Sequence, residues 1–284
     1  MSLTRRTFLA APAFLAGCTP LGVLNTVVPE DGGARRVATS IAYGPLPRQG
    51  LDIYAPTAAA RAPVIVFFYG GSWSSGRKED YSFVASAFAS AGYVCVLPDY
   101  RLFPAVRFPA FLEDCALATA WVERNIARFG GDPSRLFLAG HSAGAYNAVM
   151  VGLDRRYLDA AGGSQAAIRG VAGLAGPYDF LPLDNRTTIN VFGEAPRLDL
   201  TQPVNFARRG LPPFFLATGA DDDTVFPRNT IALAKRLRGV SVPVTEKIYP
   251  GVGHAGILLA LSVPLRGRAP VLADMLDFFR GASA

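Results

Sequence analysis

The chain has 284 residues, of which 50% are hydrophobic and 18% are charged, and its formal net charge is +6 at pH 7. This length and apolar content are typical of one large domain with a sizeable core. The positive charge would suit an acidic partner, but the arginines are scattered and no basic stripe with interleaved aromatics is present, which argues against nucleic-acid binding.

The N-terminus resembles an export signal. Arg5-Arg6 precede a short apolar stretch, Phe8–Gly17, in the manner of a twin-arginine signal. That stretch is much shorter than the roughly 20 residues that span a bilayer. It ends in Leu15–Cys18, which resembles a bacterial lipobox and implies cleavage before Cys18 and lipidation of that cysteine. Residues 1–18 are therefore predicted to direct the protein to the bacterial cell envelope, lipid-anchored to a membrane; a plain secretory peptide is the alternative.

Residues 19–36 lack hydrophobic periodicity and are predicted to be a tether before a domain at 37–284. Two cysteines remain in that domain. Cys95 lies in an apolar strand pattern and Cys115 on the apolar face of a helical pattern. We expect both to be buried free thiols, although an exported protein could pair them.

From residue 38 onward, strand patterns alternate with helical patterns. The expected strands include the continuous apolar runs PVIVFFYG, YVCVLPDY, RLFLAGHS, GVAGLAG and PFFLATGA, and the less apolar VTEKIYP. The expected helices are Asp80–Ala91, Pro109–Phe129, Pro227–Arg238 and Ala269–Arg280. This alternation predicts an α/β fold with a mostly parallel twisted sheet and helices on both faces. Sites in such sheets form at the carboxyl ends of the strands.

The segment Leu181–Pro212 interrupts this rhythm with Pro, Asn, Asp and Arg. It is too short for a full lid domain. We expect an insertion that arches over the site.

The motif Gly140-His141-Ser142-Ala143-Gly144 lies between a predicted strand and a predicted helix. A serine on such a strand–turn–helix junction needs small neighbours, and its hydroxyl is held out at the edge of the sheet. The chain has two histidines. His141 adjoins Ser142 in a sharp turn, where neighbouring side chains diverge, so His254 in a glycine-rich loop is the predicted base.

An acidic turn, Asp221–Asp223, follows the predicted strand Pro213–Thr218 and lies between the serine and the histidine in the chain. We predict that Asp222 orients His254, with Asp221 or Asp223 as alternatives and Asp179 as a remote one. No histidine-rich ligand cluster is present, and we expect neither a metal nor an organic cofactor.

Glycines also follow the strand that ends at Tyr69, where backbone N–H groups can approach a substrate without side-chain obstruction. We predict that the amides of Gly71, Ser72 and Ala143 form an oxyanion hole, to which Gly70 also contributes.

Six blocks in order resemble the α/β-hydrolase fold, and within it the hormone-sensitive-lipase-like carboxylesterases and their feruloyl/acetyl-xylan esterase and kynurenine formamidase relatives. The blocks are Tyr69–Trp73, Asp99–Leu102, Gly131–Arg135, the Ser142 turn, the Asp222 loop and the His254 loop. The order Ser…Asp…His and the G-x-x-D-x-x-V spacing around Asp222 are those of the family. The chain departs at Tyr69-Gly70-Gly71-Ser72, where the family usually has His-Gly-Gly-Gly, and it lacks the large cap of many relatives, which argues for an open site.

The resemblance implies a serine carboxylesterase that acts on small ester substrates, with short acyl chains favoured by the absence of a large lid. An arylformamidase and a carbohydrate acetyl or feruloyl esterase would use the same machinery and remain alternatives. A catalytically silent binding module on the same fold is the alternative outside enzymes.

Overall fold

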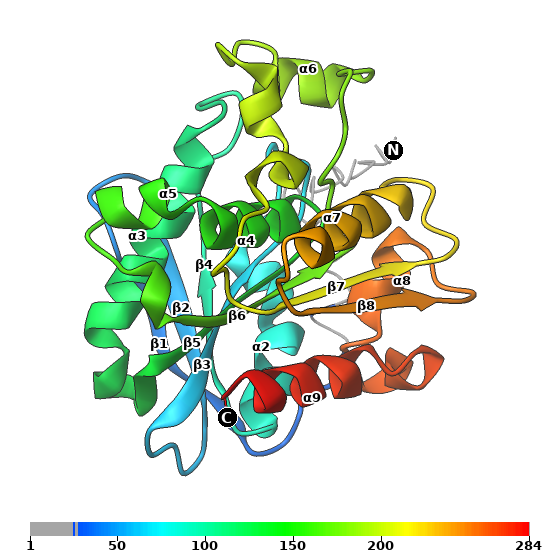
Figure 1. The fold of residues 1–284 in the computed structure, drawn as a ribbon. Helices are drawn as coiled ribbons and strands as arrows, with labels where there is room; N and C mark the ends of the chain where they lie inside the picture. Colours follow the sequence, from blue (N-terminus) through cyan, green and yellow to red (C-terminus); the bar gives the residue numbers. More distant parts are fainter. Residues whose placement is uncertain (1–24, 26–27, 284) are drawn as a thin grey trace, which may run out of the picture.

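Apolar runs form the centre of one twisted sheet in the computed structural model, which describes Asn25 and residues 28–283 (Figure 1). Within these residues eight strands pair in the order β1-β2-β4-β3-β5-β6-β7-β8. The strands are β1 (Ala34–Ala42), β2 (Gly50–Pro56), β3 (Ala62–Phe68), β4 (Val94–Pro98), β5 (Gly131–His141), β6 (Ile168–Leu174), β7 (Phe214–Gly219) and β8 (Val244–Tyr249).

The pairing explains why the polar loops of the second half of the chain converge. β1 pairs with β2 and β2 with β4 in antiparallel fashion, whereas β4, β3, β5, β6, β7 and β8 are mutually parallel. The carboxyl ends of these six strands therefore lie along one edge of the sheet. The predicted α/β-hydrolase fold with a mostly parallel sheet is confirmed.

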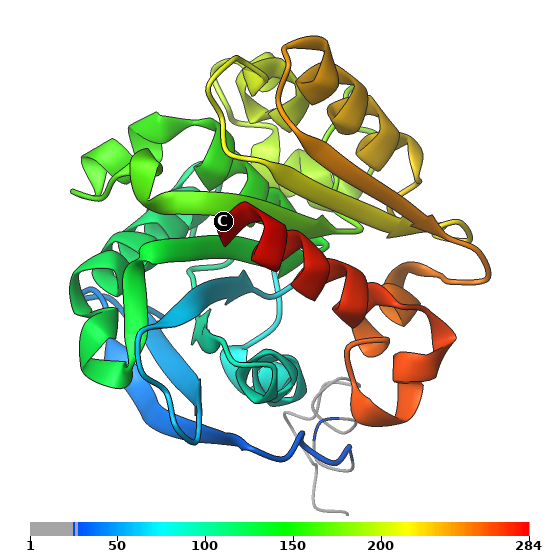
Figure 2. The same ribbon diagram turned by 60° about the horizontal axis from the view of Figure 1, so that its bottom comes forward.

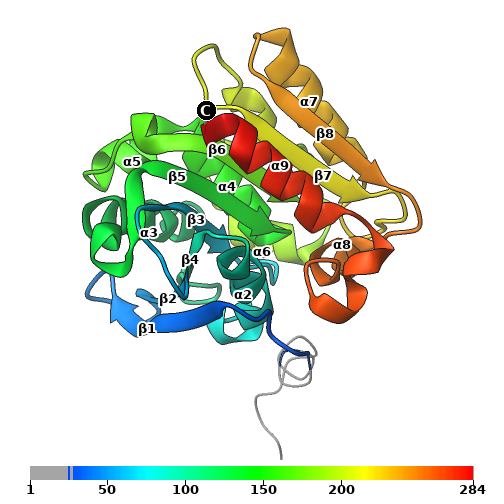
Figure 3. The ribbon, with the colours of Figure 1, turned by 90° about the horizontal axis from the view of Figure 1, so that it is seen from below.

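Helices cover both faces of the sheet. Figures 2 and 3 show α2 and α9 on one face, with α3, α4 and α7 on the other. The helices are α2 (Ser82–Ser90), α3 (Ala110–Asn125), α4 (Ala143–Leu153), α5 (Arg155–Ala160), α6 (Arg186–Phe192), α7 (Arg228–Gly239), α8 (His254–Leu259) and α9 (Val271–Ser283). Short 3₁₀ turns are η1 (Lys78–Tyr81), η2 (Ile126–Phe129), η3 (Gln165–Ala167), η4 (Leu198–Thr201), η5 (Pro203–Phe206) and η6 (Val263–Arg268).

Burial follows the position of each strand. The side chains of β3 from Val64 to Phe68 are fully buried, because helices cover both faces there. Each such aliphatic or aromatic side chain stabilises the fold by about 1.5–3 kcal/mol. The outermost strands, β1 and β8, keep exposed positions, which is why their sequences are less apolar than the central runs.

The helices largely match their predicted ranges, with local differences at their ends. The predicted helix Pro109–Phe129 is α3 followed by η2, and Gly130 ends it with φ of +81°. The predicted helix at Asp80–Ala91 begins as η1 and becomes α2 at Ser82. Cys95 and Cys115, the two cysteines of the domain, are buried free thiols, as predicted.

The segment expected to be a tether is partly structured. β1 begins at Ala34, so the sheet includes the last three residues of that segment. Asp31 pairs with Arg266 of η6 at 2.8 and 2.9 Å, and the Asn25 side chain accepts hydrogen bonds from Ser82 Oγ and the Phe83 amide of α2. The sequence gives no periodic signal here because these contacts are single polar pairs to distant residues.

The predicted export signal and lipobox, including Cys18, lie outside the described residues. Among the helices that the structure describes, none has the length and apolar content needed to cross a membrane.

The insertion Leu181–Pro212 contains one short helix, α6, and two turns, η4 and η5. Figure 1 shows α6 standing out from the body beyond α4. Leu181, Pro182 and Asp184 of this segment line a cleft that also contains Ser142. The insertion therefore forms one wall of that cleft, as expected of a short insertion without a full cap.

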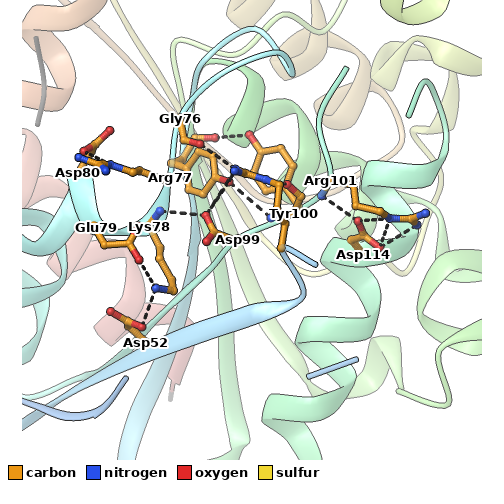
Figure 4. A network of polar contacts seen from close by, with 12 residues as sticks. Asp52, Gly76, Arg77, Lys78, Glu79, Asp80, Asp99, Tyr100, Arg101 and Asp114 are labelled. Atoms are coloured by element: carbon orange, nitrogen blue, oxygen red, sulfur yellow. Dashed lines mark hydrogen bonds and ion pairs between the residues drawn. The ribbon is translucent and has the colours of Figure 1, made fainter. Parts of the chain in front are cut away.

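A buried carboxylate connects α3 to the antiparallel part of the sheet. Asp114 is 1% exposed; it accepts hydrogen bonds from Arg101 Nε and Nη2 at 2.8 and 2.9 Å and from Gln49 Nε2 at 2.7 Å. The Arg101 amide donates to the same carboxylate at 2.9 Å. The pair of Arg101 and Asp114 is drawn in Figure 4.

Removal of this carboxylate should destabilise the protein strongly. Asp114→Ala leaves the Arg101 guanidinium and the buried Gln49 amide without their partner, at an expected cost of about 3 kcal/mol in the free energy of unfolding. Urea unfolding measures the difference. Glu113→Ala removes an exposed carboxylate that lies 4.0 Å from the same guanidinium, and as the surface control it should change stability by less than about 1 kcal/mol; equal effects of the two variants would contradict the assignment.

Candidate active site

Ser142 occupies a strained turn between β5 and α4. Its φ and ψ are +56° and −124°, and α4 begins at the next residue. A Cβ added at Gly140 would lie 2.3 Å from the Gly144 carbonyl oxygen, and one added at Gly144 would lie 2.0 Å from the Phe68 carbonyl oxygen. The glycines of the motif are therefore required by close backbone contacts, and the Ser142 amide donates to the Leu174 carbonyl at 2.9 Å.

The structure brings Ser142, His254 and Asp222 together. His254 is the first residue of α8, and its Nε2 lies 2.9 Å from Ser142 Oγ. Its Nδ1 lies 2.8 Å from Asp222 Oδ2, which follows β7. The three residues are 112 positions apart in the chain at most and meet because β5, β7 and β8 end at the same edge of the sheet.

Asp222 is held as an ionised carboxylate. It is 2% exposed, and Oδ1 accepts hydrogen bonds from the amides of Val225 at 2.8 Å and Thr224 at 3.0 Å. Burial favours the neutral acid, but the hydrogen bond from His254 and the two amides outweigh it and lower the pKa of Asp222 below its ordinary value. The ionised Oδ2 accepts the Nδ1–H of His254, so His254 Nε2 is the acceptor for the Ser142 hydroxyl.

The alternative carboxylates occupy other positions. Asp221 and Asp223 are exposed members of the same turn and make no hydrogen bond to His254. Asp179 lines the cleft, and its amide donates to Asn229 Oδ1 at 2.9 Å. Among the predicted carboxylates, the structure places Asp222 against His254.

His141 has a position that the sequence reasoning missed. Its Nε2 lies 2.9 Å from the His254 carbonyl oxygen, and the two rings are 4.9 Å apart. Complete burial, with the nearby His254 as a smaller cause, lowers the pKa of His141 to about 3. The ring is therefore neutral and donates through Nε2, and it holds the backbone of His254 while Ser142 contacts the side chain. The sequence contains one signal for this role: one of the two histidines of the chain is adjacent to Ser142.

The loop after β3 and the first residue of α4 contain backbone amides without hydrogen-bond partners among the described residues. Gly71, Ser72 and Trp73 have φ values of +123°, +53° and +55°. Within the described residues, the N–H groups of Gly71, Ser72 and Ala143 have no hydrogen-bond partner. The Gly70 amide, also expected to contribute, instead donates to Tyr81 Oη at 3.2 Å and is unavailable to a substrate.

The cleft beside Ser142 has a volume of about 750 Å³. Trp73 lines it, and the indole Nε1–H donates to Asn147 Oδ1 at 3.0 Å, while the ring packs edge-on against Phe192. Tyr100 is fully buried and stacks on Tyr69, and Phe103 lies under the Arg107 guanidinium, so neither lines this cleft.

The described residues contain no group of three or more His, Cys, Asp or Glu side chains that could hold a metal ion.

A family model described as BD-FAE matches residues 51–237 of the chain. The chain belongs to the BD-FAE family. The matched residues include the loop after β3 and the Ser142 turn, whereas His254 lies beyond them. This result confirms the resemblance to esterase families of the α/β-hydrolase fold.

Named relatives are similar over most of this chain. Esterase LipC of Mycobacterium tuberculosis is 31% identical over 77% of this chain and 60% of its own length. Carboxylesterase NlhH of the same species is 32% identical over 76% of this chain and 73% of its own length. The chain thus spans about three fifths of the length of LipC. Esterase B from Lactobacillus Rhamnosis has the same fold, with a TM-score of 0.80 at 21% identity over 93% of this chain and 90% of that one.

The burial of His141 generates a pH-dependence of stability. Between pH 6.5 and about 3 the unfolded chain binds a proton at this residue that the folded protein does not bind. The neutral His141 therefore contributes fully to the free energy of unfolding above pH 6.5. Below that pH the free energy of unfolding falls by up to about 1.4 kcal/mol per pH unit, because the unfolded chain binds the extra proton.

His141→Gln retains an N–H donor and cannot titrate, so its free energy of unfolding should depend less steeply on pH between 6.5 and 5 by about one proton. Urea unfolding of both proteins at several pH values measures this slope, and subtraction removes the shared contribution of the carboxylates. Identical slopes would show that His141 is protonated in the folded protein.

Proposed function

We propose that this protein is a serine carboxylic ester hydrolase. The observation that carries the proposal is the 2.9 Å contact between His254 Nε2 and the Oγ of Ser142, a residue that lines an open cleft. The similarity to Esterase LipC and Carboxylesterase NlhH supports ester hydrolysis. The serine mechanism is inferred from the geometry of the three side chains.

In this mechanism His254 Nε2 takes the proton of Ser142 as Oγ attacks the ester carbonyl carbon. The proton then passes to the alcohol oxygen as the ester C–O bond breaks, which leaves an acyl group on Ser142. Water attacks the acyl carbon and gives a proton to His254; the bond between that carbon and Oγ then breaks, and His254 returns the proton to Oγ as the acid leaves. Asp222 keeps the proton on Nδ1 throughout and stabilises the positively charged ring.

The negative oxygen that forms in each step needs donors that are already in place. The unpaired amides of Gly71, Ser72 and Ala143 are suited to this role, since removal of one such donor typically costs about 3 kcal/mol of transition-state stabilisation. Ala143 is also the first residue of α4, where the helix dipole favours negative charge.

We also propose that the acyl chains are short. The insertion Leu181–Pro212 contributes one short helix in place of a large cap, and the cleft of about 750 Å³ is open to solvent. A small ester fits such a site without a mobile lid.

Carbohydrate esters form a second candidate class because the cleft walls carry many polar side chains. These are Asp179, Asp184, Asn185, Thr187, Thr188, Thr224 and Arg228. Hydroxyl-rich groups can exchange their bonds with water for bonds with such side chains. The ratio of hydrolysis rates on acetylated xylan and on p-nitrophenyl butyrate separates the two classes, and N-formylkynurenine tests the arylformamidase alternative.

A fluorophosphonate probe tests the mechanism. Wild-type protein should be labelled and should hydrolyse p-nitrophenyl butyrate; Ser142→Ala should be neither labelled nor active. Asp222→Asn should reduce kcat by about 10,000-fold because His254 loses its orienting anion. Ser90→Ala, in α2, is the control and should match the wild type. Equal labelling of wild type and Ser142→Ala would refute the proposal, and absence of labelling would favour a silent binding module.

We further propose that the protein is exported and lipid-anchored through Cys18 at a bacterial membrane. The motif Leu15–Cys18 supports this proposal. Asn25 contacts α2, and the chain between Cys18 and Asn25 can span at most about 25 Å. In a bacterial host the N-terminal peptide should carry a diacylglycerol mass that Cys18→Ser lacks. An exported wild-type protein with a free Cys18 thiol would contradict the proposal.

A further inference from the structure

The loop that carries the Gly71 and Ser72 amides has an unfavourable backbone conformation. Ser72 and Trp73 are non-glycine residues in the left-handed region. Such conformations persist only where the surrounding structure over-determines them. Trp73 is fixed by its indole bond to Asn147 and by its carbonyl, which accepts the Phe103 amide at 2.8 Å. At the first end of the loop, the Tyr69 carbonyl oxygen accepts a hydrogen bond from Tyr100 Oη at 2.7 Å; the Tyr69 phenol and Gly76, at the other end, share a further contact.

One arginine contacts both of these ends. Arg48 Nη2 donates to Tyr69 Oη at 2.6 Å and to the Gly76 carbonyl oxygen at 2.7 Å. Its Nε donates to the Tyr100 carbonyl oxygen at 2.9 Å. Arg48 lies in the connection between β1 and β2, outside the residues that the family model matches, with φ of +67°.

Asp99 completes the arrangement. Its Oδ1 accepts hydrogen bonds from Tyr69 Oη at 2.9 Å and from the Lys78 amide at 3.0 Å, and it lies 3.6 Å from Arg48 Nη2. Figure 4 shows Asp99 between Lys78, Gly76 and Tyr100. Burial raises the pKa of Tyr69 well above its ordinary value, so the phenol keeps its proton and donates to Asp99. Its oxygen can then accept from Arg48.

We propose that Arg48 is a positioning residue for the oxyanion hole: it joins the two ends of the loop 69–76 and thereby fixes the Gly71 and Ser72 amides. Tyr69 is its contact at the first end, in the place where the family usually has histidine. A phenol can accept from Arg48 and donate to Asp99 at once, which suits both partners. The inference rests on the proposed ester hydrolysis for its kinetic test.

The kinetic test compares Arg48→Met, Arg48→Lys and Tyr69→Phe with the wild type. Displaced amides stabilise the transition state less and leave substrate binding almost unchanged. Arg48→Met should therefore lower kcat on p-nitrophenyl butyrate by about 10–100-fold, less than the 100–1,000-fold that follows loss of a whole donor, with KM within about threefold. Affinity for a trifluoromethyl ketone, whose adduct carries the oxyanion, should fall in parallel. Arg48→Lys, which retains the charge and donors, should recover part of the loss.

Arg36→Met is the matched control. Arg36 lies on β1 and pairs with the buried Asp52 at 3.5 Å, but it does not touch the loop. It should lose stability without a change in kcat at a temperature where the protein is folded. Arg48→Met with wild-type kcat and ketone affinity would overturn the proposal, as would parallel kinetic losses in Arg36→Met.

Amide hydrogen exchange gives a readout that does not need activity. The hydrogen-bonded amides of Gly70, Ser74 and Ser75 should exchange faster in Arg48→Met and in Tyr69→Phe than in the wild type, with β5 unchanged. Wild-type protein without esterase activity would refute the proposed function alone, whereas unchanged exchange in both variants would refute the role of Arg48. If Arg48→Met fails to fold, Arg48→Lys and Tyr69→Phe still decide the question.

Discussion

The close contact between the end of β3 and the first turn of α4 is the constraint on which the site depends. The backbone of Gly144 approaches the carbonyl oxygens of Phe68 and Tyr69 so closely that a Cβ there would lie 2.0 and 2.4 Å from them. This contact places the loop after β3 beside the turn of Ser142. In the proposed mechanism, the amides of Gly71, Ser72 and Ala143, which come from two distant parts of the chain, then bind one reacting oxygen. Any side chain at Gly144 would separate the two halves of the site.

Two histidines lie at the same edge of the sheet, and their different surroundings suit them to different roles. His254 is partly exposed at the start of α8, where its Nδ1 contacts the ionised Asp222 and its Nε2 contacts Ser142 Oγ. His141 is enclosed, and protonation would place a charge in a dry environment where its Nδ1 has no partner in the described part of the chain. It stays neutral and supports the His254 backbone. In the proposed mechanism, the proton transfers use the His254 ring, while the His141 ring serves as a fixed hydrogen-bond donor.

Much of the fold and the main site residues could be predicted from the sequence, because each relied on a local pattern. Continuous apolar runs marked the buried strands, and the histidine count singled out His254. The contacts of His141, Arg48 and Tyr69 could not be predicted in this way. Arg48 and Tyr69 are 21 positions apart in the chain and are joined by a single hydrogen bond, and a periodic pattern in the sequence does not reveal such a pair. The same reason explains why Asp31, paired with Arg266 across 235 positions, was placed in a tether.

Backbone strain concentrates where the chemistry is proposed. Of the eight non-glycine residues with positive φ among those described, Ser142 and Ala175 directly follow parallel strands at the carboxyl edge, and Ser72 and Trp73 lie in the loop after β3. Each such conformation costs about 1–3 kcal/mol. The strands β3, β5 and β6, which are buried over the residues that lead to these turns, offset that cost because they fix the positions from which the strained turns start. A rigid core is thus a condition for catalysis here: a looser sheet would let these residues relax to ordinary backbone angles, and Ser142 and the free amides would no longer converge.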